Sequence, residues 1–121
     1  LVKRSRTDIE RDIGNYTVLE HDGVIFACAA LYPYPEAGTA EMAALTVSPQ
    51  SQGQGDGEKV LKRVEQRARL MGLKSIFVLT TRTMHWFIKR GFQVVDPDWL
   101  PDARKRKYNW DRRSQVLVKN L

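Results

Sequence analysis

Apolar and polar residues follow two different periods along this 121-residue chain, and these periods divide it into strands and helices. Six segments are apolar or alternating, are rich in β-branched and aromatic residues, and are bounded by turn residues, which is typical of strands. These segments are 16–20, 24–32, 39–47, 75–80, 92–95 and 116–118. The runs 24–32 and 75–80 are almost continuously apolar, which predicts that they are buried inside a sheet.

A helical period follows the third of these strands and ends at Gly72. The apolar residues of this helix form one stripe, made of Val60, Leu61, Val64, Ala68 and Met71. Shorter helices are expected at 8–13, 84–90 and 102–107. Strands and helices mixed in this order predict one α/β (α+β) domain in three layers, which we expect to span residues 1–121.

A glycine-rich loop joins the third strand to this helix. Gly53, Gly55 and Gly57 occupy alternate positions, so backbone N–H groups can turn into one concavity without obstruction from Cβ atoms. The helix that follows directs the positive end of its dipole to the same place. The loop therefore predicts a phosphate or pyrophosphate site. It lacks the Lys-Ser/Thr ending of a P-loop and the spacing of the dinucleotide fingerprint, and a flexible linker is the simpler alternative.

Composition and charge add limits to this prediction. The net charge of +6 suits a polyanionic partner, either a phosphate-rich cofactor, a nucleic acid or an anionic lipid. No apolar run approaches the roughly 20 residues of a membrane span, and no signal peptide opens the chain. The single Cys28 excludes an internal disulfide and lies in an apolar run, where a structural thiol is expected. We therefore expect a cytoplasmic setting, and no metal.

The loop and its flanks carry a family resemblance. Val47-Ser48-Pro49 followed by Gln52-x-x-Gly55-x-Gly57 resembles the GNAT superfamily of acetyltransferases, whose pyrophosphate loop runs Arg/Gln-x-x-Gly-x-Gly/Ala after a strand ending in Val-x-Pro. The resemblance implies a GNAT-like three-layer mixed sheet flanked by helices, with acetyl-coenzyme A as co-substrate. The residues that it implies for the coenzyme are Leu45, Thr46, Val47, Gln52, Gly53, Gln54, Gly55, Asp56 and Gly57.

Three further segments narrow the resemblance within that superfamily. Residues 28–32, 77–82 with 85–87, and 108–114 are similar to the acetyltransferase domains of bacterial N-acetylglutamate synthases, which begin arginine biosynthesis. This resemblance implies acetyl transfer to the α-amine of L-glutamate. In that family an amino-acid-kinase-like domain precedes the acetyltransferase domain and builds the oligomer. We therefore expect the C-terminal part of a longer, homo-oligomeric protein.

Glu41 is the candidate base, because it is a carboxylate in an otherwise apolar strand, where partial burial is expected to raise its pKa. The resemblance implies the same role, with a water between Glu41 and the amine. Arg4, Arg112 and Ser114 match family positions that hold the glutamate carboxylates, and arginine offers a planar fork of donors for them. The alternatives are a surface carboxylate on an edge strand and a solvated run of arginines.

The acid that protonates the leaving thiolate is less evident. Many GNAT members carry a tyrosine for this step, and the matching residue here is Phe87, which has no proton to give. Thr80, His85 and Tyr108 are candidates by their chemistry. Thr80 matches a position where relatives place a hydroxyl near the sulfur, whereas His85 is expected to be a surface histidine.

Two rival functions stay open at this point. Residues 102–113 are basic with interleaved aromatics, which is also typical of a nucleic-acid surface, although the segment carries two Asp residues. A GNAT enzyme with another amine acceptor, a protein or a polyamine, is the second rival. A polyamine site would need acidic residues where this chain has arginines. A domain that binds acetyl-coenzyme A but needs a partner domain for activity is a further possibility.

Overall fold

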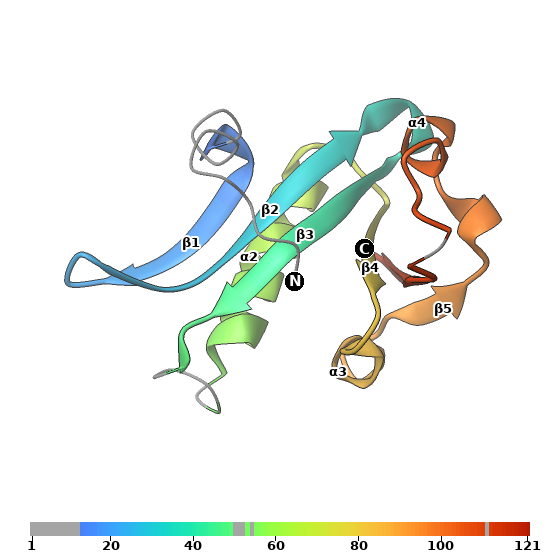
Figure 1. Cartoon of the computed structure of the whole chain (residues 1–121). Coiled ribbons are helices and arrows are strands. Elements are labelled where there is room, and N and C mark those ends of the chain that lie inside the picture. Colours follow the sequence, from blue (N-terminus) through green and yellow to red (C-terminus); the bar gives the residue numbers. More distant parts are fainter. Residues whose placement is uncertain (1–12, 50–52, 54, 111) are drawn as a thin grey trace.

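A computed structural model of the chain describes residues 13–49, 53, 55–110 and 112–121, and within them the strands form one six-stranded sheet (Figure 1). The strands lie in the order β1-β2-β3-β4-β6-β5. Their bounds are β1 Tyr16–His21, β2 Val24–Tyr34, β3 Thr39–Val47, β4 Ser75–Thr80, β5 Gln93–Val95 and β6 Gln115–Asn120. Each strand that the hydrophobic pattern predicts is present, and β6 extends beyond the predicted run at both ends.

Short helical segments connect the strands of the described part of the chain. The α-helices are α2 Asp56–Leu70, α3 Met84–Ile88 and α4 Asp102–Lys105, and the 3₁₀ turns are η1 Ile13–Asn15, η2 Pro35–Ala37 and η4 Pro97–Trp99. Both α3 and α4 end two residues earlier than predicted, because the N–H groups of Arg90 and Lys107 bond to carbonyls three residues back. Of the helix predicted at 8–13, only Ile13 lies within the described residues, and it begins η1.

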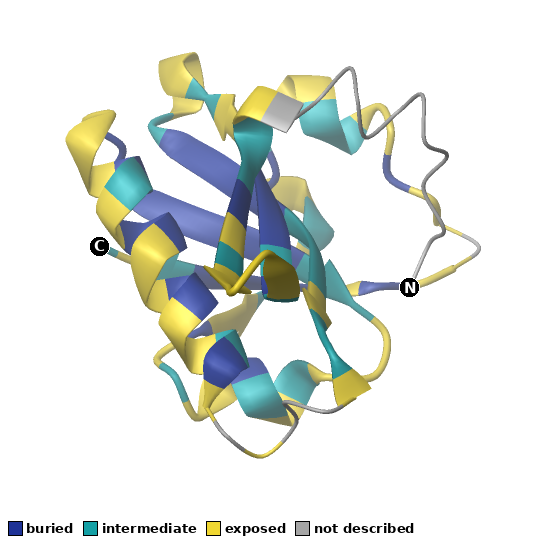
Figure 2. Ribbon diagram, turned by 90° about the vertical axis from the view of Figure 1, so that its left-hand side faces the viewer, coloured by how far each residue is buried: buried dark blue, intermediate teal, exposed yellow. Residues whose placement is uncertain are grey.

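The sheet is covered on both faces, which gives the three layers that the sequence predicts. On one face, the first four residues of the predicted stripe on α2 pack with α3 against inward-facing strand residues such as Ile76 and Leu117. The fifth, Met71, was wrongly predicted to be buried: it is the C-cap that follows α2 and is exposed. On the other face, Leu100 and Tyr108 cover Phe77 and its neighbours on β6. Successive residues of β4 alternate between these two cores, as the pleat of a strand requires. Figure 2 shows buried and exposed residues side by side along the long helix.

The middle of the sheet is open at one end. β3 and β4 form the parallel pair in this sheet, and they pair only from Thr39 to Glu41 with Ser75 to Phe77. Beyond these residues the two strands separate (Figure 1). A bulge in β3 accompanies the separation, because two residues of β3 stand opposite one residue of β2, and Ala44 within it has a φ of +55°. Backbone groups of β3 past Glu41 therefore have no partner on β4.

The packing predicts unequal costs for the same substitution at two leucines. Leu117 is fully buried on β6, whereas Leu70 is 88% exposed at the end of α2. We expect Leu117→Ala to reduce the free energy of unfolding by about 2–5 kcal/mol, because it removes buried methyl groups and leaves a cavity. Leu70→Ala is the control and should change it by less than about 0.5 kcal/mol. Urea unfolding followed by circular dichroism measures both, and equal losses would contradict the assignment of the core.

Candidate active site

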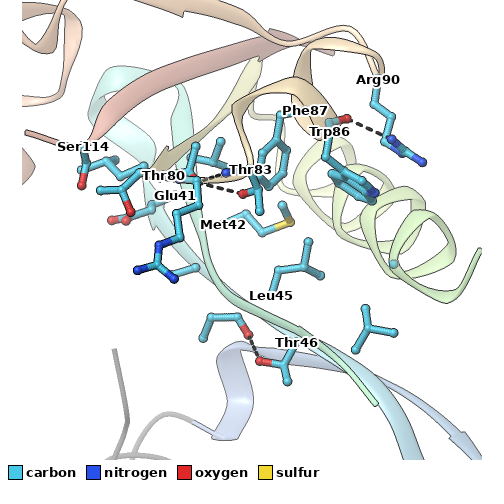
Figure 3. A pocket seen from close by; sticks show the side chains of 18 of the residues that line it. Glu41, Met42, Leu45, Thr46, Thr80, Thr83, Trp86, Phe87, Arg90 and Ser114 are labelled. Atoms are coloured by element: carbon cyan, nitrogen blue, oxygen red, sulfur yellow. Dashed lines mark hydrogen bonds between the residues drawn. The ribbon is translucent and has the colours of Figure 1, made fainter. Parts of the chain in front are cut away.

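A cleft of about 1110 Å³ occupies the gap between β3 and β4. Its lining includes Met42 and Phe87 from the face covered by α2 and α3, and Glu41 and Ser114 from the opposite face. In Figure 3, Glu41 and Ser114 lie to one side of Met42, and Phe87 lies to the other. The cleft therefore passes through the sheet, so that two molecules can enter from opposite faces and meet between the separated strands.

The glycine loop forms one end of this cleft. Gly53 and Gly55 both have left-handed backbones, with φ of +87° and +78°, and Gly55 is the N-cap of α2. A Cβ atom on Gly57 would lie 3.2 Å from the Trp86 ring, so this glycine serves close packing. The described residues that the resemblance implied for the coenzyme all line the cleft, namely Leu45, Thr46, Val47, Gly53, Gly55, Asp56 and Gly57. Gln52 and Gln54 lie outside the described residues.

A cation that the sequence reasoning missed lies beside this loop. The Arg90 guanidinium stacks on the Trp86 ring, 3.9 Å from the ring centroid, and its Nη1 donates to the Trp86 carbonyl at 2.9 Å. Both side chains line the cleft, and Figure 3 shows them together at the end away from Glu41. The spacing of four residues between Trp86 and Arg90, within the helix predicted at 84–90, is the sequence feature that could have indicated this contact. The arrangement places a fixed positive charge near the N-terminus of α2.

Glu41 lies at the opposite side of the cleft, in an ion pair. Its Oε1 accepts a hydrogen bond of 2.6 Å from Arg104 Nε, and its Oε2 accepts a longer one of 3.4 Å from Nη2. The Glu41 side chain is 12% exposed, on a strand flanked by β2 and β4, so the edge-strand alternative is wrong. No local pattern in the sequence indicates this partner, because Arg104 is one of several cations in the basic segment 102–113.

Aromatic side chains of the neighbouring strands surround Glu41. Tyr32 stands opposite Glu41 in the antiparallel register of β2, and Phe77 stands beside it on β4. Burial, and then the negative charge of Glu41, raise the pKa of Tyr34, while Arg104 acts in the opposite direction. The Tyr34 hydroxyl consequently stays protonated at neutral pH. The carboxylate thus lies in a largely apolar setting with one charged partner among the described residues.

Other cations and a hydroxyl line the same side of the cleft. Arg112 and Ser114, two of the predicted acceptor residues, are brought into the lining together with Lys107. The Tyr108 hydroxyl donates to the Ser114 carbonyl at 2.6 Å, which fixes the position of this segment. Arg4 lies outside the described residues. The acceptor side therefore combines one paired carboxylate with several donors suited to anions.

The candidate acids are in different situations. The Thr80 hydroxyl lines the cleft, bonds to the Thr83 hydroxyl at 2.8 Å and accepts the Thr83 N–H at 3.0 Å (Figure 3). Tyr108 is buried and its proton is used by Ser114, and His85 is exposed and outside the lining of the cleft. Phe87 lines the cleft without a proton to give. Of the three candidates, His85 lies outside the cleft and the Tyr108 hydroxyl donates to a carbonyl. Thr80 lines the cleft, and its hydroxyl donates to no carbonyl of the described residues.

Two further sequence expectations concern chemistry outside the cleft. Cys28 is half-buried rather than fully buried, it does not line the cleft, and burial raises the pKa of its thiol. A protonated thiol outside the cleft is not a nucleophile for this site. Among the described residues, no group of three or more His, Cys, Asp or Glu side chains is placed to hold a metal ion. None of the described helices combines the length and the apolar character needed to cross a membrane.

Comparison with known proteins agrees with this geometry. Amino-acid acetyltransferase of Ralstonia nicotianae is 63% identical over 121 residues, which are 100% of this chain and 27% of that protein. N-acetylglutamate synthase from Neisseria gonorrhoeae, complexed with coenzyme A and N-acetyl-glutamate, has a TM-score of 0.94 and 43% identity over 100% of this chain and 29% of its own. The same synthase complexed with coenzyme A and L-arginine has a TM-score of 0.89 at 43% identity, covering 100% and 28%.

The chain spans less than a third of the length of these relatives. The superposition confirms the three-layer mixed sheet that the resemblance implied. The model of the Acetyltransferase (GNAT) family matches residues 2–92, a range that includes the glycine loop, Glu41 and the separated strands. The chain therefore belongs to the GNAT family of acetyltransferases.

Proposed function

We propose that this chain transfers the acetyl group of acetyl-coenzyme A to the α-amine of L-glutamate, giving N-acetyl-L-glutamate and coenzyme A. The observation that carries the proposal is the cleft through the sheet. The glycine loop lies at one end, and Glu41 with several cationic side chains lies at the other. A thioester and an amine that enter from opposite faces meet beside the unpaired backbone of β3. Similarity to the gonococcal synthase supports both substrates.

The reaction is a direct transfer within a complex of both substrates. The Glu41 carboxylate takes a proton from the α-ammonium group through a water, and the freed amine attacks the thioester carbonyl carbon. The C–N bond forms, the C–S bond breaks, and the developing oxyanion accepts hydrogen bonds from β3 N–H groups that β4 leaves unpaired. The attacking nitrogen is cationic once the C–N bond has formed and releases its second proton to water, and the leaving thiolate takes a proton from Thr80 or from water. Cys28 takes no part, since it lies outside the cleft.

The acceptor is selected by charge. Arg112 and Ser114 hold the carboxylates of glutamate, with Arg4 as a third contact implied by the family resemblance. A polyamine is disfavoured, because Glu41 is already paired with Arg104, and the other carboxylates of the lining, Asp56 and Glu58, belong to the first turn of α2 at the glycine loop. Of the basic residues in 102–113 that suggested a nucleic-acid surface, Arg104, Lys107 and Arg112 line the cleft.

The rest of the protein enters the proposal as well. The chain covers 27% of the Ralstonia relative, so we infer a longer protein with an amino-acid-kinase-like domain upstream. We also infer homo-oligomers that act in the cytoplasm, in agreement with a single cysteine. Sensitivity to L-arginine is a property to examine in that longer protein, because the gonococcal synthase was crystallised with it.

The acceptor assignment is tested by thiol release from acetyl-coenzyme A with each amino acid in turn. Glutamate should give the highest kcat/KM, and release without preference would contradict the substrate but not the family. Arg112→Met should raise KM for glutamate about ten- to hundredfold, because a charge-assisted hydrogen bond to the substrate is lost. KM for acetyl-coenzyme A should not change. Arg113→Met is the control, since Arg113 does not line this cleft.

The role of Glu41 is tested with Glu41→Gln, which keeps an oxygen that can accept from Arg104. We expect kcat to fall by about 10²-fold or more, because the amine loses its general base. The acid limb of the profile of kcat/KM against pH should also disappear. Glu36→Gln, at an exposed position in η2, is the control. An unchanged rate and profile in Glu41→Gln would remove Glu41 from the mechanism.

The glycine loop is tested with two glycines that share one backbone angle. Gly55 in the loop and Gly23 in the β1–β2 hairpin both have φ of +78°. Valine at either position costs about 1–3 kcal/mol of backbone strain, so both variants should lose similar stability. Only Gly55→Val should raise KM for acetyl-coenzyme A. Equal KM values in the two variants, measured by thiol release, would show that the loop does not bind the coenzyme.

A further inference from the structure

The ion pair between Glu41 and Arg104 joins two segments that are 63 residues apart in the chain. Glu41 comes from β3 beside the open gap of the sheet. Arg104 comes from α4, on the face of the sheet that Leu100 and Tyr108 cover. Their side chains are 12% and 16% exposed, and the shorter of their two hydrogen bonds measures 2.6 Å. The pair is therefore largely removed from water while it lines the cleft.

The Glu41–Arg104 ion pair is expected to contribute little to the stability of the fold. Removing two charges from water costs about as much as their attraction returns, so a buried ion pair contributes little net stability. Arg104 also leaves its Nη1 atom buried without a hydrogen-bond partner among the described residues. A guanidinium placed only to hold the fold would be expected to use all its donors. The position is better explained by what Arg104 does to Glu41.

The neighbours of Glu41 leave Arg104 as its source of positive charge. Tyr32 and Tyr34 face it from β2, and the raised pKa of Tyr34 keeps that hydroxyl neutral. Phe77 adds an apolar ring from β4. Within the described part of the chain, no other ion pair involves Glu41. Without Arg104 the carboxylate would be buried among aromatic rings, where the protonated form is favoured and a base is lost.

We propose that Arg104 is a positioning residue for acetyl transfer, which holds Glu41 ionised and oriented to accept the proton of the acceptor amine. The proposal rests on the proposed function, in which Glu41 is the base. The attraction has a cost, since Glu41 gives up its charge when it takes the proton from the ammonium group. A cation beside a carboxylate favours its charged form, which is the form that accepts a proton.

The chain segment that carries Arg104 also carries the acceptor contacts. Lys107, Arg112 and Ser114 follow it within one turn-rich stretch, which the bond from Tyr108 to the Ser114 carbonyl closes. An acceptor held by Arg112 and Ser114 is thus held by the same segment that orients the base. This connection explains how the base and the acceptor amine keep a common alignment across the gap of the sheet.

The test compares the pH dependence of kcat/KM in the wild type, Arg104→Met and Arg104→Lys. In Arg104→Met the buried carboxylate loses its cation, its pKa rises, and the acid limb should move to higher pH by about one unit or more. The loss of rate should be large at low pH and small at high pH. Arg104→Lys keeps the charge and should return the limb towards its wild-type position. Arg106→Met, on the exposed C-cap of α4, is the control and should change neither.

A second comparison separates a role through Glu41 from a role in folding. If Arg104 acts through Glu41, adding Arg104→Met to Glu41→Gln should cost no further activity. Arg104→Gln keeps a hydrogen-bond donor but removes the charge. We expect this variant to fold and still to show the shifted acid limb. Circular dichroism verifies folding, and Arg104→Gln replaces Arg104→Met if the methionine variant does not fold.

The outcomes distinguish this proposal from the proposed function. An equal loss of rate at every pH, with the acid limb in place, would overturn the role of Arg104 and leave Glu41 as the base. Additive losses in the double variant would do the same. An unchanged profile in Glu41→Gln would instead overturn the base itself. A shifted limb that Arg104→Lys restores, with no additional loss in the double variant, supports the proposal.

Discussion

The separation of β3 from β4 is the constraint on which the rest of the site depends. Parallel strands normally continue their ladder for the length of both elements, because every unpaired backbone group loses a hydrogen bond. Here the ladder ends after Glu41, and the bulge at Ala44 bends β3 away from its neighbour. The separation leaves backbone groups of β3 unpaired and holds Ala44 in a left-handed conformation. It also opens a gap in the sheet lined by fixed N–H donors, which can bind a thioester carbonyl.

The opening also separates two chemical environments. One face offers the N-terminus of a 15-residue helix, left-handed glycines and an arginine stacked on Trp86, which suits a phosphate group. The other face offers a buried carboxylate and several cations, which suits an amino acid with carboxylates. Because the sheet lies between them, two molecules bound in these environments would not compete for the same surface. In the proposed function, their reactive ends meet where the strands have separated.

The Glu41–Arg104 pair is better explained by the chemistry of the site than by a contribution to stability. The cores on both faces stabilise the domain by burying apolar side chains, and the pair adds little to that. One buried donor atom of Arg104, Nη1, has no hydrogen-bond partner among the described residues. Such departures from good packing are expected where a site needs a charge in an apolar place. The same pair links Glu41, the proposed base on β3, to the segment that carries Arg112 and Ser114.

The local elements and the residues with distinctive chemistry could be predicted from short stretches of sequence. The two hydrophobic periods predicted the strands and α2, the glycine spacing predicted a phosphate loop, and the lone carboxylate in an apolar strand indicated Glu41, because each signal lies within a few neighbouring residues. The folded chain was needed to show that β3 and β4 separate, that Arg90 stacks beside the loop, and that Arg104 pairs with Glu41 from 63 residues away. These features come from contacts between distant segments, and a basic run such as 102–113 does not reveal which cation faces the cleft until the chain is folded.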